Sequence, residues 1–282
     1  MVSMRHLSAI MLCFVSMLGQ SDVFAQNYTI TFRDPAGDDN GPGTYVYPTD
    51  AVYKKGSFDM LDATFKVTGD DVQVSIGVNC PLEDPWRTGA GFAVQMIFVF
   101  IDADDKLLSG HQQSIPGLNN KWAMGSGWEK CIIICPAGKD RVNKEIDEKA
   151  AALKSDIVVP DRVKAGTGRM ISAYLKKSAL GDIDLRKCKF QVVMCSYEGF
   201  PDASDLFVRK VNEYEGQHRF GGGNDGDCDP NIIDCLAGTA SGAADEGDKQ
   251  HRMLGSYKCK EDGTAASLVL LPFIGPQASQ IR

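Results

Sequence analysis

Alternation of apolar and polar residues is the dominant pattern of this chain, and it constrains the fold more than any other feature. The pattern is clearest in NYTITFRD (27–34), DATFKVTGDDVQVSIGVN (62–79) and CKFQVVMCSY (188–197). A period of two residues buries one face of a β-strand and leaves the other face in solvent. The chain is therefore predicted to consist mainly of strands that share a core.

Other segments complete this prediction. FAVQMIFVFID (92–102) is continuously apolar, as expected of a central strand that is covered on both faces. Asp70 and Asp71 follow Gly69 and predict a hairpin turn. Shorter strands are expected in KCIIICP (130–136), SDIVVP (155–160), GRMISAYL (168–175) and AASLVLLPFI (265–274). About nine or ten strands separated by turn-rich loops indicate an all-β protein, an antiparallel β-sandwich.

One segment favours a helix. DRVNKEIDEKAAALKSD (140–156) is rich in Ala, Lys and Glu, and its apolar residues fall roughly on one face. We expect a short helical insertion that lies over an edge of the sandwich. Residues 221–250 contain many Gly, Ala and Asp and are expected to be the most flexible part. No linker divides the chain, so residues 26–282 are predicted to form a single β-sandwich domain.

The first 25 residues resemble a secretory signal peptide. Arg5 and His6 precede an apolar run from Ala9 to Leu18, and Ala25 supplies a small residue at the expected cleavage point. The run is too short to span a bilayer, and no later stretch is long and apolar enough. We expect an exported protein, secreted or held at the cell surface, with no transmembrane segment after cleavage.

Nine cysteines occur in the chain, and Cys13 would leave with the signal peptide. An even number in an exported chain suggests disulfides, although free buried thiols remain an alternative. Acidic residues outnumber basic ones, 37 to 30, and no dense Lys/Arg stripe is present. Nucleic acid is therefore not an expected partner.

Several motifs resemble the glucodextranase C-terminal domain family. They are DPAGDDNGPGTYVYPTD (34–50), GSFDMLDATFKV (56–67), DPWRTGAGFAVQMIFVFID (84–102), PGLN (116–119) with a Trp after it, and FGGGNDGDCDPNIIDCL (220–236). The family is similar to DOMON-like and carbohydrate-binding-module-like β-sandwiches. It occurs as a non-catalytic module of secreted amylolytic enzymes and on surface-layer-associated proteins. The resemblance implies binding of a polysaccharide, with α-glucans included, or of a cell-envelope polymer.

The acidic segment 34–50 also suggests a calcium site. Calcium takes six to eight oxygen ligands, and irregular Gly/Pro backbone can turn carbonyls and carboxylates inward. The candidate ligands are Asp34, Asp38, Asp39, Asp59 and Asp102. The resemblance likewise implies a calcium-stabilised sandwich. The alternative is that these Asp side chains only cap turns. NDGDCDPN (224–231) is not an EF-hand; it is either a second irregular oxygen site or a polar turn pinned by Cys228 and Cys235.

Carbohydrate binding requires aromatic faces that stack on pyranose rings. Trp122 and Trp128 lie in a Gly-rich loop, where exposure is plausible, and Tyr45 and Tyr47 lie in the acidic segment. These four residues are the candidate carbohydrate contacts. Trp86 follows Pro85 directly before the apolar strand, which favours a packing role.

Catalysis finds little support in the sequence. The mature chain would retain three isolated histidines, and neither G-x-S-x-G nor H-E-x-x-H occurs. We therefore expect a secreted, calcium-stabilised module that binds carbohydrate or a cell-surface polymer and is not an enzyme. One alternative is a structural or adhesive envelope protein that assembles through its sandwich. Another is a glycoside hydrolase, which needs only two carboxylates across a cleft.

Overall fold

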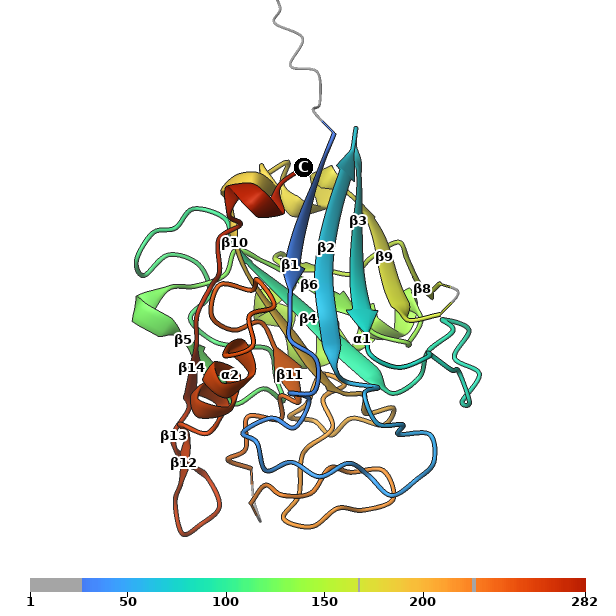
Figure 1. Ribbon diagram of the computed structural model, residues 1–282, viewed down its shortest axis with the longest axis vertical. Helices are drawn as coiled ribbons and strands as arrows, with labels where there is room; N and C mark the ends of the chain where they lie inside the picture. Colours follow the sequence, from blue (N-terminus) through green and yellow to red (C-terminus); the bar gives the residue numbers. More distant parts are fainter. Residues whose placement is uncertain (1–26, 167, 225–226) are drawn as a thin grey trace, which may run out of the picture.

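The fold is a β-sandwich. A computed structural model describes residues 27–282 except residues 167, 225 and 226, so the expected signal peptide lies outside the described residues (Figure 1). The first sheet has the order β1 (Tyr28–Arg33), β2 (Met60–Thr68), β3 (Asp71–Val78), β9 (Met170–Lys176), β8 (Arg162–Ala165), and every pair in it is antiparallel. The all-β prediction is confirmed.

The second sheet lies behind the first in Figure 1. Its order is β11 (Asp234–Cys235), β10 (Lys189–Ser196), β4 (Gln95–Asp102), β6 (Lys130–Ile134), β7 (Ile157–Val158). Two small pairs are separate: β5 (Asn120–Trp122) with β14 (Val269–Leu271), and β12 (Lys258–Cys259) with β13 (Ala265–Ser267). The β6–β7 and β5–β14 pairs are parallel, so the second sheet is mixed and the sandwich is not purely antiparallel.

Local patterns located the long strands well and the short ones poorly. The hairpin register pairs Thr68 with Asp71, so the turn residues are Gly69 and Asp70, one position earlier than predicted. The predicted strand 265–274 is divided into β13 and β14. The strands β5, β8, β11 and β12 have two to four residues each, too few for an alternation pattern to become visible.

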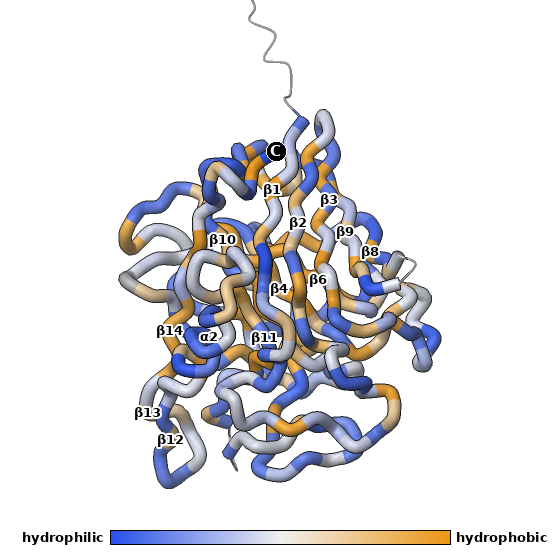
Figure 2. The backbone as a smooth tube through the Cα atoms, viewed as in Figure 1, coloured by the Kyte–Doolittle hydropathy of each residue, from blue (hydrophilic) through white to orange (hydrophobic). Residues whose placement is uncertain are grey.

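The main core lies between the two sheets. Phe32 of β1, Phe65 of β2 and Phe190 of β10 meet there with ring centroids 4.6 to 6.1 Å apart. These distances are typical of favourable aromatic pairs. Figure 2 shows apolar backbone segments concentrated in the interior strands β4, β6 and β10.

A second core covers the outer face of the second sheet. All eight residues of β4 are buried, and Phe98 and Phe100 point away from the main core into this second one. Helix α1 (Lys139–Lys149) contributes Val142 and Ile146 to it. The predicted helix at 140–156 therefore exists but ends at Lys149, and a short 3-10 helix at Ala151–Leu153 follows. Helix α1 helps to cover the outer face of the second sheet, which explains why β4 is apolar on both faces.

Helix α2 (Glu246–Leu254) begins inside the Gly-, Ala- and Asp-rich range 221–250, where the sequence predicted no regular structure. Its first residue, Glu246, is 1% exposed and accepts hydrogen bonds from the backbone N–H groups of Thr239, Ser241, Gly242 and Ala243. Burial raises the pKa of Glu246, but these hydrogen bonds outweigh burial and hold that pKa below its usual range. Side-chain contacts, and not helix propensity, order this Gly- and Ala-rich segment.

Cysteine pairing agrees only partly with the prediction. Cys228 forms a disulfide with Cys259, so the polar turn at 224–231 is not pinned by Cys228 and Cys235. The other six described cysteines are free and buried, which matches the alternative of buried thiols. No helix among residues 27–282, as far as these are described, is both long and apolar enough to cross a membrane.

Gln250 of α2 provides the first prediction, because it links the helix to β11 and to the acidic segment. Its side chain is fully buried, accepts from the Cys235 N–H at 2.9 Å and donates to the Asp38 carbonyl at 2.7 Å. We expect Gln250→Ala to lower the free energy of unfolding by about 2–4 kcal/mol, since it leaves two buried backbone groups without partners. Urea unfolding would measure the change.

The matched control is Lys249→Ala on the same helix. Lys249 has a half-exposed side chain that pairs with Asp245, so its loss should cost no more than about 0.5 kcal/mol. Equal destabilisation by the two substitutions would contradict the role assigned to Gln250.

Candidate metal and ligand site

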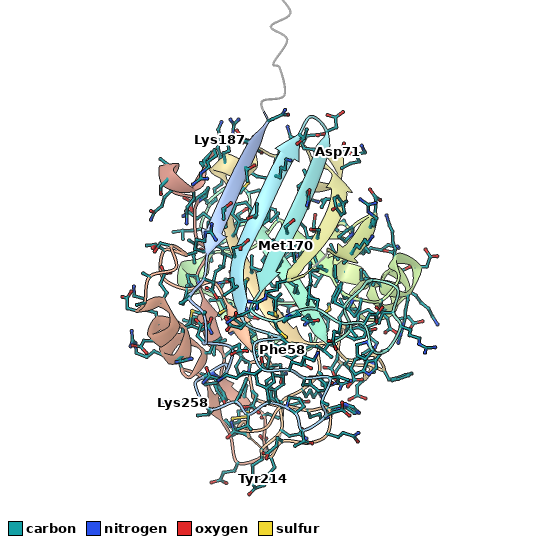
Figure 3. The ribbon with its side chains drawn as sticks, turned by 45° about the vertical axis from the view of Figure 1, so that its right-hand side comes forward. Phe58, Asp71, Met170, Lys187, Tyr214 and Lys258 are labelled. Carbon is teal, nitrogen blue, oxygen red and sulfur yellow. A yellow bond between two sulfur atoms is a disulfide. The ribbon has the colours of Figure 1, made fainter. Side chains whose placement is uncertain are left out.

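The acidic segment 34–50 crosses one end of the sandwich. It begins where β1 ends at Arg33, and Figure 1 shows it in blue, beside the orange segments that follow β10. Gly41 is required for its path, because φ is +57° and a Cβ would lie 2.3 Å from Cδ2 of Tyr45. In Figure 3, Phe58 lies where the strands meet this layer of loops, and Tyr214 lies at its tip. We call this region the loop end.

Three carboxylates converge at the loop end. One oxygen of each of Asp34, Asp38 and Asp234 lies within 4.8 Å of the others, and the three residues are 6%, 4% and 0% exposed. Asp234 belongs to β11, and its Oδ2 accepts from the Met60 N–H at 2.6 Å. The cluster therefore brings the acidic segment, which follows β1, next to β11. The hydrogen bond from Met60 also links β11 to the start of β2.

Most oxygens of this cluster have no hydrogen-bond donor among the described residues. Both oxygens of Asp34, both of Asp38 and Oδ1 of Asp234 are buried and unpartnered, and so is Oδ1 of the neighbouring Asp59. A buried carboxylate without a donor or a counter-charge is strongly destabilising. Six such oxygens in one place match the oxygen-rich ligand set that calcium prefers.

The electrostatics point the same way. Burial, followed by repulsion from neighbouring carboxylates, raises the pKa values of Asp34 and Asp234 well above their usual range. The same two causes raise the pKa of Asp38 to about 7. Like charges in a low-dielectric site disfavour ionisation unless a cation is present. The arrangement can therefore hold protons or a divalent cation.

Two further predicted ligands surround the cluster. Asp59 uses Oδ2 to accept from the Gly37 N–H at 2.8 Å and from Asn79 at 3.0 Å, and its Oδ1 is left unpartnered. Asp39 accepts a hydrogen bond from the Tyr47 hydroxyl and is 7% exposed. Both carboxylates contribute to the raised pKa of Asp38.

Asp102 does not join this site. It ends β4, whereas Gln95 at the start of β4 donates to the Ser57 carbonyl at the loop end. Asp102 lies instead with Asp104 and Glu129 in a second acidic group. The Asp102 carboxylate accepts from the backbone N–H of Asp105 at 2.8 Å, and Glu129 accepts from that of Ala103 at 2.8 Å. Asp102 therefore caps a turn, the alternative that the sequence left open.

Asp234 is the residue that sequence reasoning missed. It is one of many acidic residues in the second half of the chain, and it lies just after the Asp- and Gly-rich turn 224–231, which drew attention away from it. Only the pairing of β11 with β10 carries it to the loop end. An indirect signal existed, because NIIDCL places one acidic residue between apolar residues.

The candidate aromatic residues lie differently from the expectation. Trp122 and Trp128 are 4% and 0% exposed and pack in the second core, so the expectation of exposure is wrong for both. Tyr45 is also buried, and Tyr47 is half-buried. Trp86, for which a packing role was favoured, is the most exposed tryptophan at 38%. It meets Tyr53 edge-on at the loop end, with 6.3 Å between ring centroids.

Two adjoining depressions open at the loop end. One, of about 430 Å³, is lined by Gly37, Asp39, Asn40, Tyr47, Tyr53 and Lys55. The other, of about 440 Å³, is lined by Ala36, Gly37, Asp39, Lys55, Gly56, Asp59 and Asn79. Because they share Gly37, Asp39 and Lys55, we call them together the loop-end groove.

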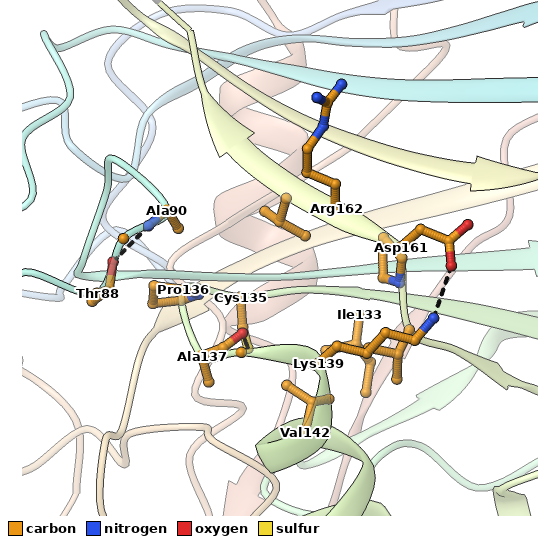
Figure 4. Close-up of a pocket in the computed structure, with 15 residues that line it drawn as sticks. Thr88, Ala90, Ile133, Cys135, Pro136, Ala137, Lys139, Val142, Asp161 and Arg162 are labelled. Carbon is orange, nitrogen blue, oxygen red and sulfur yellow. Dashed lines mark hydrogen bonds and ion pairs between the residues drawn. The ribbon is translucent and has the colours of Figure 1, made fainter.

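A smaller depression of about 270 Å³ lies at the start of α1 (Figure 4). Its charged rim includes Lys139, which pairs with Asp161 at 2.8 Å. Its lining mixes polar and apolar residues, and no residue of the acidic segment contributes to it. It therefore has no part in the cluster of carboxylates.

Comparison with known families identifies a match over most of the chain. A family model described as the SLH-like C-terminal binding module of glucodextranase matches residues 29–270. Apart from Tyr28 at the start of β1, the matched range includes the strands of both large sheets, and it contains the acidic segment and Asp234. A search of curated proteins found no match.

The raised pKa values predict an unusual pH dependence for the metal-free protein. A carboxyl with a folded pKa of about 7, as for Asp38, binds its proton more tightly in the folded state than in the unfolded state, where the pKa is about 4. The contribution of each such carboxyl to the free energy of unfolding is then fully present below about pH 4. It is lost as pH rises toward 7, by up to about 1.4 kcal/mol per pH unit.

Chemical unfolding in excess chelator between pH 5 and pH 8 measures this dependence. We expect the free energy of unfolding to fall as pH rises, and the slope to become smaller in Asp38→Asn. A free energy that rises with pH in the chelated wild type would contradict the assigned electrostatics.

Proposed function

Because the chain belongs to the family of SLH-like C-terminal binding modules of glucodextranase, we propose that it is a secreted module that binds carbohydrate without turning it over. The family describes a binding module and not a catalytic domain. The match extends over most of the chain, which makes this family assignment the observation that carries the proposal. The ligand is a polysaccharide, such as an α-glucan, or a polymer of the cell surface.

Placement outside the cytoplasm is part of the proposal. The SLH-like character of the family supports an extracellular or cell-surface protein. The signal-like segment 1–25 supports the same placement. The Cys228–Cys259 disulfide is also typical of exported proteins.

We further propose that calcium stabilises the loop end. The supporting observation is the set of six buried, unpartnered oxygens on Asp34, Asp38, Asp59 and Asp234. Calcium would supply the counter-charge that these carboxylates lack. Asp34, Asp38 and Asp234 would hold it, with Asp59 at the side, and so tie the end of β1 to β11.

Calcium addition tests the metal proposal directly. We expect calcium at about 100 times its dissociation constant to stabilise the chelated wild type by about 2.7 kcal/mol at neutral pH. Asp38→Asn should lose most of this increment, because it removes one charge of the cluster. The measurement is thermal unfolding with and without calcium.

Asp104→Asn is the matched control, since Asp104 belongs to the second acidic group and receives hydrogen bonds from Lys106 and Ser109. It should keep the calcium increment of the wild type. A melting temperature that calcium leaves unchanged in the wild type would remove the metal proposal, and loss of the increment in Asp104→Asn would move the site.

Carbohydrate binding is tested by native electrophoresis in gels that contain soluble starch or dextran. We expect retarded migration of the wild type and no release of reducing sugar from either polymer. A glycan array that includes α-glucans extends the test to other ligands. Unchanged migration in the gels together with no binding on the array would remove the carbohydrate proposal. Release of reducing sugar would instead favour the glycoside hydrolase.

A further inference from the structure

The loop-end groove has the size and lining of a ligand site. Each of its two depressions, of about 430 and 440 Å³, falls in the range of ordinary ligand pockets. Tyr47 and Tyr53 supply aromatic surface at one end. Asn79 and Asp59 supply polar groups at the other end, and Lys55 stands between them.

Groove residues are held in place by the structure beneath them. The Tyr47 hydroxyl donates to Asp39, and its ring packs 4.9 Å from that of Phe220. Tyr53 stacks on Phe58 with an interplanar angle of 11°, and its hydroxyl accepts from Arg209 at 2.7 Å. A rigid wall of this kind loses little conformational entropy when a ligand binds.

Trp86 extends the aromatic wall outward. Its ring meets Tyr53 at 6.3 Å and His218 at 6.1 Å, both edge-on, and the residue is 38% exposed. The exposed fraction of Trp86 leaves part of its side chain accessible to a ligand. The other two tryptophans are buried in the second core, so Trp86 is the tryptophan available for stacking on a sugar ring.

The charges of the groove select the class of glycan. Its lining includes two carboxylates that are almost fully buried, Asp39 and Asp59, and one exposed cation, Lys55. The whole chain also carries a net charge of −7. An acidic polymer would be repelled, whereas a neutral glycan can offer hydroxyls to carboxylate, amide and ammonium groups and an apolar ring face to Trp86.

From these observations we infer that the loop-end groove binds a neutral polysaccharide, with Trp86 as its stacking platform. This inference rests on the proposed carbohydrate-binding function and specifies where the glycan lies and what charge it has. It replaces the buried Trp122 and Trp128 as the candidate contacts and retains Tyr47.

Substitution at Trp86 tests the position of the site. We expect Trp86→Ala to raise the dissociation constant for starch or dextran roughly tenfold or more, as measured by affinity electrophoresis, because it removes the aromatic ring on which the sugar is inferred to stack. Lys55→Ala, an exposed position on the groove, should weaken binding several-fold and serves as a second variant. Both variants should keep the calcium-induced rise in melting temperature, which shows that they fold.

Phe200→Ala is the matched control. Phe200 is 90% exposed and lies outside the groove lining, so binding should equal that of the wild type. Acrylamide quenching of tryptophan fluorescence gives an independent readout, since among the three tryptophans only Trp86 is substantially exposed. Saturating starch or dextran should lower the quenching constant several-fold.

The outcomes separate the inference from the function on which it rests. The groove assignment is overturned if Trp86→Ala and Lys55→Ala both bind starch or dextran with the dissociation constant of the wild type. It is also overturned if the quenching constant does not change at saturation. Either result leaves the proposal of carbohydrate binding intact. Tighter binding of polygalacturonate, an anionic polysaccharide, than of starch or dextran overturns the selection for neutral glycans. Absence of wild-type binding to all three polymers counts against the proposed function itself.

Discussion

The burial of several carboxylates at one point is the constraint on which the loop end depends. Asp34 and Asp38 of the acidic segment meet Asp234 of β11 there, and all three have almost no exposure to solvent. Such a cluster is unfavourable unless protons or a cation neutralise it. Hydrogen bonds nevertheless fix the position of the cluster. The Gln250 side chain donates to the Asp38 carbonyl, and the Asp234 carboxylate accepts from the Met60 N–H at the start of β2. A neutralised cluster would therefore connect both sheets and α2.

The second core explains why the aromatic residues are divided as they are. β4 is buried on both faces, so a layer of helix and loop must cover the outer side of the second sheet. Trp122 and Trp128 are used in this cover, where Trp122 packs 4.7 Å from Phe100. Trp86 precedes β4 at the loop end, outside this layer, and keeps an exposed ring. Packing of the second sheet thus decides which tryptophan is free for recognition.

Local sequence patterns predicted most of the fold and part of the site. Alternation located β1, β2, β3 and β10, because a half-buried strand shows its period in the sequence. It did not reveal β11, which has two residues, or α2, whose order depends on hydrogen bonds to Glu246. The acidic composition of segment 34–50 indicated an oxygen-rich site, and Asp34 and Asp38 lie in the cluster.

By itself, the sequence determined the strand periodicity, the turn-rich acidic segment and the strand at 92–102 that is apolar on both faces. All three are properties of neighbouring residues. Tertiary structure alone decided that Asp234 joins Asp34 and Asp38 and that Asp102 does not. It also decided that Trp86 is exposed and Trp128 is buried. The physical reason is that such outcomes depend on which apolar faces pack together across large separations in the chain, and a local pattern does not contain that information.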